Sequence, residues 1–166
     1  NAYNFMDGIN GITGLYSLSF LLSIGWLNNS YHFIDDYLLM PLLASILVFL
    51  FFNFRKKAKC FAGDVGSVSM AFTICFLLIS LIKTSHNLIY LGFLLVYGLD
   101  AVTTIIFRII RKENIFEAHR SHFYQFLVNE KKISALIVSS TYAIVQLLIN
   151  ILLIREYKNT MPVVTA

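Results

Sequence analysis

The sequence predicts an all-α protein, a polytopic transmembrane helical bundle with about five membrane-spanning helices. Hydrophobic residues make up 58% of the 166 residues and charged residues 13%, whereas a soluble domain has roughly 45–50% apolar and about 25% charged residues. The mean hydropathy is +0.73. The apolar residues also gather into runs near the ~20 residues that a helix needs to cross a bilayer. Together these observations favour a membrane protein over a soluble one.

Five apolar segments of membrane-helix length form the expected bundle. Short polar joins separate most of them, and the longest join covers residues 111–132. No low-complexity tract, linker or internal repeat divides the chain, so we expect a single domain. The segments are residues 12–28, 37–54, 65–83, 88–110 and 133–154.

The first residues of the chain already form a motif, and the chain starts with Asn1. We therefore expect residues 1–166 to be the C-terminal part of a single multi-pass membrane domain, with the N-terminal half absent. Neither of the two cysteines, Cys60 and Cys75, has the spacing of a metal site or a redox motif. We interpret both as structural.

Lysine and arginine residues are concentrated on one side of the predicted helices. Because basic residues accumulate in cytoplasmic loops, we place residue 1 in the cytoplasm, which leaves only Lys83, Arg155 and Lys158 on the other side. The same bias accounts for the net charge of +4, so this charge requires no nucleic-acid partner. The basic residues on the cytoplasmic side are Arg55, Lys56, Lys57, Lys59, Arg108, Arg111, Lys112, Arg120, Lys131 and Lys132.

The opening stretch, residues 1–14 (NAYNFMDGINGITG), gathers polar side chains and glycines directly before an apolar run. Polar groups so close to a membrane segment are costly unless they are used. The alternative is a helix start that asparagine or aspartate caps. The candidates for chemistry are Asn4, Asp7 and Asn10.

A second motif, FAGDVGS at residues 61–67, places Asp64 between two glycines just before a predicted helix. A carboxylate beside bare backbone suits Mg²⁺, which prefers oxygen ligands and often shares them with substrate phosphates. A helix cap is again the alternative.

A third motif, EAHRSHFYQ at residues 117–125, brings His119, Arg120 and His122 into four residues. Arginine binds phosphate oxygens through two parallel hydrogen bonds, and histidine donates to them or moves protons near neutral pH. A histidine pair for a transition metal and a purely basic loop are the alternatives. All three motifs lie on the predicted cytoplasmic face, where together they suit a metal-bound diphosphate and phosphoryl transfer to a lipid acceptor.

Three further acidic residues lie in or between the apolar segments. Asp35 and Asp36 fall on the opposite face, across ~30 Å of hydrocarbon, and we interpret them as a solvated loop. Asp100 lies within an apolar segment, where a carboxylate is costly. It either orients a neighbour at the border of a site or makes a structural hydrogen bond to Thr103 or Thr104. A membrane transporter subunit would need ionisable residues at the midplane, and only Asp100 clearly qualifies.

In their order, the three motifs resemble those of the polyprenyl-phosphate N-acetylhexosaminyl-1-phosphate transferases of glycosyl transferase family 4. NAYNFMDGING is similar to the family's NxxNxxDGxDG loop, FAGDVGS to its MGDxGS loop, and HRSHFYQ to its RxHxHH loop. The resemblance covers essentially the whole chain. It implies transfer of an N-acetylhexosamine 1-phosphate from a UDP-sugar (a UDP-N-acetylhexosamine) to undecaprenyl phosphate, with release of UMP and with Mg²⁺ as cofactor.

The resemblance also implies roles for single residues and a place in the cell. Asp64 would be a magnesium ligand, Asn4 and Asp7 would lie at the catalytic centre, and Asn10 would contact the uracil. The substrate phosphates or sugar would be bound by His119, Arg120 and His122. The implied location is the bacterial inner membrane, with the active site facing the cytoplasm, and a homodimer is one assembly that we consider.

The chain departs from the family pattern at three points. The aspartate-rich DDxxD-type motif of the family's N-terminal half is absent, so we expect this chain alone to be inactive, and an inactive truncated product is the alternative function. Asn10 replaces the common aspartate, although an amide can still pair with the adjacent carbonyl and N–H of uracil. Tyr124 and Gln125 replace the last two histidines, which favours the branch that starts O-antigen (lipopolysaccharide) synthesis.

Overall fold

The computed structural model describes residues 2–114 and 122–160, and the described chain is all-helical. This confirms the predicted fold class. The helices follow one another as α1 (Ala2–Phe5), α2 (Ile12–Tyr31), α3 (Asp36–Asn53), α4 (Gly63–Ser85), the 3₁₀-helix η1 (Leu88–Leu94), α5 (Leu95–Ile110), α6 (Phe123–Asn129) and α7 (Ala135–Thr160).

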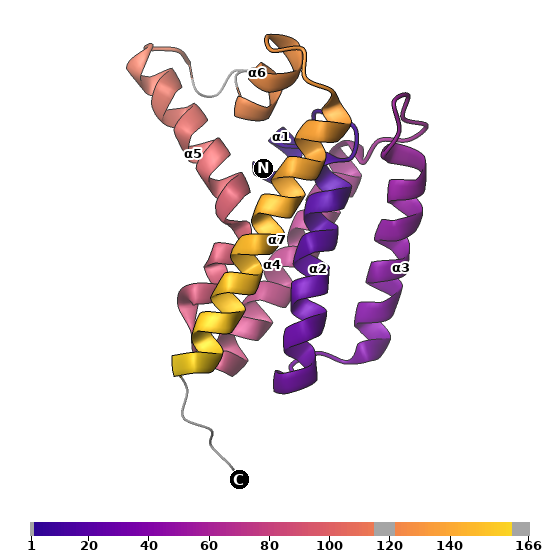
Figure 1. Ribbon diagram of the computed structural model, residues 1–166, viewed down its shortest axis with the longest axis vertical. Coiled ribbons are helices and arrows are strands. Elements are labelled where there is room, and N and C mark those ends of the chain that lie inside the picture. Colours follow the sequence, from indigo (N-terminus) through magenta and orange to yellow (C-terminus); the bar gives the residue numbers. More distant parts are fainter. Residues whose placement is uncertain (1, 115–121, 161–166) are drawn as a thin grey trace.

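Helix α2 is the centre of the bundle. It packs against α7, α3 and α4, and Figure 1 shows α3 on one flank of the molecule and α5 on the other. Large apolar side chains at a spacing of three to four residues are fully buried along it, including Ile12, Tyr16, Phe20 and Ile24. This spacing places them on one face of a helix, and that face forms the core between α2 and its neighbours.

Four helical stretches of the described chain are long and apolar enough to cross a membrane: Asp36–Asn53, Gly63–Ser85, Leu88–Ile110 and Ala135–Glu156. The remaining predicted segment, residues 12–28, forms α2. It is helical as expected but is not among these four membrane-length stretches. It buries Ser17, Ser19, Ser23 and Asn28. Such polar residues are found inside membrane bundles where other helices supply their hydrogen-bond partners.

The polar residues of α2 are bonded to α7 through a chain of side chains inside the bundle. The Tyr16 hydroxyl donates to Gln146 Oε1 at 2.7 Å. Gln146 Nε2 donates to Asn150 Oδ1 at 2.7 Å, and Asn150 Nδ2 donates to Ser23 Oγ at 2.9 Å. Because lipid supplies no hydrophobic force between helices, bonds of this kind fix which faces of α2 and α7 meet.

The predicted segment 88–110 is not one helix, because the 3₁₀-helix η1 ends at Leu94 and α5 starts at Leu95. At this break Gln146 Nε2 donates to the Gly92 carbonyl, and the Val96 N–H donates to Gln146 Oε1, both at 2.9 Å. The buried Gln146 amide thus gives the Val96 N–H a partner at the break, and it adds a second bond to the Gly92 carbonyl, which also accepts the Leu95 N–H. Beyond the break α5 diverges from α7 toward the end where α6 lies (Figure 1).

Candidate active site

The first two motifs meet at one end of the bundle. Ser67, in the first turns of α4, donates through its hydroxyl to Asn4 Oδ1 at 2.9 Å. The Asp7 carboxylate accepts a bond from the Thr13 hydroxyl at 2.6 Å and another from the backbone N–H of Gly63. The opening stretch and the start of α4 therefore form one continuous polar surface, although about sixty residues separate them in the sequence.

Asp7 and Asp64 have different surroundings. Asp7 is half-buried, and burial is the largest influence on its carboxyl: it raises the pKa, while the hydrogen bonds from Thr13 and Gly63 oppose the rise. Asp64 is exposed in the first turn of α4, a favourable place for a negative charge. The cap position of α4 belongs to Ala62, so Asp64 is not the helix cap.

The donor set at this surface is suited to a hard cation. Asp7, Asp64 and the Asn4 carbonyl offer oxygen atoms, which are the ligands that Mg²⁺ prefers. Among residues 2–114 and 122–160, no three histidine, cysteine or acidic side chains form a metal cluster. Magnesium is often held by one or two carboxylates together with substrate phosphates and water, and the residues present fit that mode rather than a closed protein site.

Asn10 lies on the outer side of the same loop, against the basic loop that follows α3. Its Nδ2 donates to the carbonyl of Arg55 at 2.8 Å and to that of Lys56 at 3.4 Å. The buried Asn53 makes a second tie, because its Oδ1 accepts the N–H of Gly11 at 2.7 Å and its Nδ2 donates to the Cys60 carbonyl at 2.8 Å. Nothing in the residue pattern points to this role for Asn53, which lies at the end of an apolar run.

Gly11 shows why the opening loop needs glycine. Its φ is +87°, in the left-handed region, and a Cβ there would lie 2.4 Å from Cδ2 of Phe54. A side chain at this position would be strained by the backbone and would clash with the residue that follows α3. The glycine thus lets the opening loop lie directly on the start of the basic loop.

The third motif is described only from His122 onward, and His119 and Arg120 lie outside the described residues. His122 precedes α6 and is 3% exposed. Its Nδ1 lies 3.1 Å from Oδ1 of Asp100, and its ring stacks near that of Phe5 with centroids 6.5 Å apart. His122 therefore lies between α5 and the opening stretch, at the same end of the bundle as Asn4.

Tyr124 joins α6 to the opening stretch. Its hydroxyl donates to the Phe5 carbonyl at 2.9 Å, and burial raises its pKa. A Cβ on Gly8 would lie 2.2 Å from that hydroxyl oxygen, so only glycine leaves room for the tyrosine. Gln125 is a local cap, since its Oε1 accepts the His122 N–H at 3.3 Å. These contacts give Tyr124 and Gln125 structural roles in the assembly of the site.

The acidic residues Asp35 and Asp36 lie at one end of the bundle and Asp100 toward the other. Asp35 caps α3 by accepting the Tyr37 N–H at 2.9 Å, and Asp36 accepts from Asn28 Nδ2 at 3.0 Å. Both lie at the end of α3 away from the site, although they are bonded to the fold rather than part of a free loop. Asp100, by contrast, belongs to the site end of the molecule through its contact with His122.

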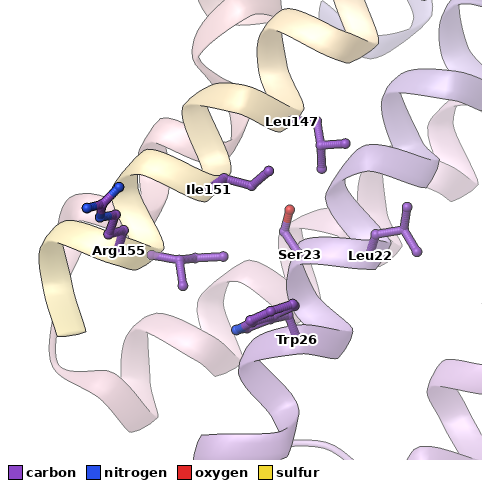
Figure 2. Close-up of a pocket in the computed structure, with 7 residues that line it drawn as sticks. Leu22, Ser23, Trp26, Leu147, Ile151 and Arg155 are labelled. Carbon is purple, nitrogen blue, oxygen red and sulfur yellow. The ribbon is translucent and has the colours of Figure 1, made fainter.

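Two cavities differ in what they can offer chemically. One, of about 570 Å³, lies between α5 and α6 and is lined by Thr104 and Gln125 as well as apolar rings and Arg111. The other, of about 460 Å³, lies between α2 and α7 near their far ends. Figure 2 shows Leu22 and Trp26 of α2 facing Ile151 and Arg155 of α7 across it. Its lining holds no carboxylate or histidine, so the α5–α6 cavity is the one associated with the site.

Comparison with known proteins finds one family model and several transferases that are similar to this chain. Residues 1–82 match the family model of glycosyl transferase family 4. The chain is 32% identical over 133 residues to a probable undecaprenyl-phosphate N-acetylglucosaminyl 1-phosphate transferase of Bacillus subtilis, covering 77% of this chain and 37% of that protein.

Phospho-N-acetylmuramoyl-pentapeptide-transferases match as well. The one from Thermotoga neapolitana is 30% identical over 138 residues, which cover 81% of this chain and 45% of the relative. The one from Streptococcus agalactiae serotype Ia is 30% identical over 103 residues, or 61% of this chain and 30% of the relative. The chain thus spans between about a third and just under half of the length of these relatives.

The family match covers the opening stretch and the FAGDVGS motif, which are the two segments that the fold joins through Asn4 and Ser67. The aligned relatives are transferases in name, and the chain itself has four helices suited to a membrane among its described residues. In residues 1–82, the chain has the sequence of glycosyl transferase family 4.

Proposed function

We propose that the full-length protein transfers an N-acetylhexosamine 1-phosphate from a UDP-sugar to undecaprenyl phosphate and releases UMP. The observation that carries this proposal is the junction of the opening stretch with α4, where Ser67 bonds Asn4 and the Gly63 N–H bonds Asp7. Two matched family segments thereby present carboxylate and amide oxygens on one surface. Such a surface suits a nucleoside diphosphate sugar held with a divalent cation.

In this proposal Asp64 would hold Mg²⁺, which would offset negative charge on the substrate phosphates. Asn4 is kept in place by its bond to Ser67 and directs its amide toward the same surface. Asp7 is half-buried with a raised pKa, so it is suited to accept or hold a proton at the reacting centre. Asn10 is proposed to contact the uracil through its Oδ1, since its Nδ2 is engaged by the basic loop.

The anion-binding side of the proposed site is formed by the third motif. His122 lies at the site end of the bundle, and we propose that His119 and Arg120 join it in binding phosphate or sugar. The cavity between α5 and α6 adjoins His122 through Thr104, and three phenylalanine rings line it beside polar and charged side chains. Such a mixed lining suits the phosphorylated end of a lipid acceptor that enters from the bilayer.

The relatives differ in the transferred group that their names specify. One name gives N-acetylglucosaminyl 1-phosphate and the other gives phospho-N-acetylmuramoyl-pentapeptide. We propose the simpler N-acetylhexosamine for this chain, as the first step of a lipid-linked glycan such as O-antigen. The basis is Tyr124 and Gln125, which stand where the resembling motif has histidines. The excess of basic residues at the site end favours a cytoplasmic site in a bacterial inner membrane. A homodimer stays a prediction.

The test uses the full-length protein in nanodiscs, with UDP-N-acetylglucosamine, undecaprenyl phosphate and Mg²⁺. We expect release of UMP and formation of a lipid-linked diphosphate sugar, both lost on addition of EDTA. Asp64→Asn should lower the rate by about 10²-fold or more, because it removes the carboxylate that would hold Mg²⁺ and with it the positive charge on the substrate phosphates. Asp35→Asn is the matched control at the other end of the bundle and should retain the rate. Turnover by Asp64→Asn at the unsubstituted rate would refute the metal assignment.

A transport function gains no such support. Asp100, the ionisable residue that favoured it, accepts hydrogen bonds from α5, α6 and α7 within the fold. A carboxylate bonded in this way is part of the packing between helices rather than of a water-filled path.

A further inference from the structure

Asp100 is the meeting point of three helices at the candidate site. It lies in the second turn of α5, is 5% exposed, and accepts hydrogen bonds on both carboxylate oxygens. Oδ1 lies 3.1 Å from His122 Nδ1, 3.3 Å from Thr104 Oγ1 and 3.0 Å from the Phe123 N–H. Oδ2 accepts from the Tyr142 hydroxyl at 2.6 Å and from the Tyr124 N–H at 3.3 Å.

These bonds hold α6 by its first turn. Phe123 and Tyr124 are its first two residues, and their N–H groups have no partners within a helix of seven residues. The Asp100 carboxylate supplies those partners from another helix. So short a helix is marginal alone, and its place in the fold therefore depends on Asp100.

The same carboxylate sets the ring of His122. An ionised aspartate only accepts hydrogen bonds, so the contact at 3.1 Å requires a proton on Nδ1. In the neutral imidazole the lone pair then lies on Nε2, because the bond made by one ring nitrogen decides the state of the other. Thr104 Oγ1, at 3.3 Å from Nδ1, lies close to both partners.

Tyr142 completes the arrangement from α7. Its hydroxyl makes the shortest of the contacts to Asp100, on the oxygen that does not face His122. A bond at this position restricts rotation of the carboxylate, as partners of metal- or substrate-binding histidines commonly do. The ring of His122 is thus fixed by Asp100, and Asp100 by Tyr142.

We propose that Asp100 is a positioning residue, which with Tyr142 holds His122 in one orientation with Nδ1 protonated. The inference rests on the proposed function for its catalytic consequence, which is that the ring lone pair lies on Nε2, a buried atom of the fold without substrate, rather than on Nδ1. The arrangement itself is a property of the fold. It can therefore be measured apart from the reaction.

The first measurement is the ¹⁵N spectrum of the full-length protein labelled at histidine, in nanodiscs without substrate. The His122 signals are identified by their loss in His122→Gln. We expect a protonated Nδ1. A neutral His122 with its proton on Nε2 alone overturns the proposal, and this result does not depend on whether the protein is active.

The second measurement is the split of kcat and KM in the transfer assay. Asp100→Asn places an N–H₂ group against either the Phe123 or the Tyr124 N–H, so we expect kcat to fall by about 10- to 100-fold, which is a larger factor than the rise in KM for the UDP-sugar. Tyr142→Phe, which keeps the His122 contact, should cause a smaller fall in kcat. Tyr37→Phe on α3, whose side chain is 89% exposed, is the matched control and should retain kcat.

The outcomes separate the two proposals. If the unsubstituted protein forms no lipid-linked product, the proposed function fails, while the Nδ1 signal still decides the positioning of His122. If Asp100→Asn fails to fold, the kcat of Tyr142→Phe and the spectrum of the unsubstituted protein decide whether Asp100 positions His122. Unchanged kcat in folded Asp100→Asn overturns the positioning role.

Discussion

Replacement of Gln146 by leucine tests whether one amide holds the break between η1 and α5. The Gln146 side chain makes four short contacts: Tyr16, Asn150, the Gly92 carbonyl and the Val96 N–H. Leucine has a similar volume but makes none of these bonds. The Gly92 carbonyl would keep its bond from the Leu95 N–H, whereas the part-buried Val96 N–H would lose the partner that Gln146 supplies.

The expected loss follows from these contacts. Hydrogen bonds between membrane helices contribute ~0.6 kcal/mol on average, and a buried polar group left without a partner costs about 1–3 kcal/mol. With two side-chain bonds lost and one backbone N–H left without its partner, we expect Gln146→Leu to lower the free energy of unfolding by about 2–4 kcal/mol. A loss of this size is a large fraction of the stability of most domains.

The assay is equilibrium unfolding of the full-length protein in mixed micelles at increasing SDS fraction. Thr141→Ala is the control on the same helix: its exposed hydroxyl bonds only the Ile137 carbonyl of its own helix, so its effect should stay within about 0.5 kcal/mol. If Gln146→Leu costs no more than Thr141→Ala, the break does not depend on this amide and the reasoning is wrong.

Two further predictions concern the opening loop. Burial raises the pKa of Asp7, so the folded state holds its proton to higher pH than the unfolded state and stability falls as the pH rises through that range. Asp7→Asn should therefore raise the thermal unfolding temperature at pH 7 more than at pH 4, and an equal effect at both would contradict the burial argument. Gly8→Ala should destabilise the fold because its Cβ would meet the Tyr124 hydroxyl oxygen at 2.2 Å. Since Tyr124→Phe removes that oxygen, the double variant should lose less than the sum of the single losses by about 1 kcal/mol, and strict additivity would show that the two residues do not meet.

The helices themselves were predictable because long apolar runs leave few alternatives in a membrane protein. Four of the five predicted segments match helices with bounds that differ by a few residues, and the opening stretch does meet the start of α4. What the pattern could not contain was the break at Leu94, since 3₁₀ and α-helical residues are equally apolar. The pattern of residues 88–110 predicts one helix, because Gln146, which stabilises the break, lies on another helix.

The site was predictable where glycine and acidic residues mark a loop, and not where a polar residue lies inside an apolar run. Asn53 and Asp100 both fall in this second class. Each acts through partners far away in the sequence, Gly11 for Asn53 and His122 for Asp100. A single polar residue in a helix shows that a partner is needed, but the partner becomes known only when the fold brings the helices together.

The chain of side chains between α2 and α7 has a consequence for the order of assembly. Helix α2 ends at Tyr31, whereas the helix that bonds Tyr16 and Ser23 starts only at Ala135. During synthesis α2 thus enters the membrane long before those two hydroxyl groups meet Gln146 and Asn150. Helix α2 therefore inserts before its buried hydroxyl groups are hydrogen-bonded to α7. The packing around α2 is complete only when α7, the last long helix, docks.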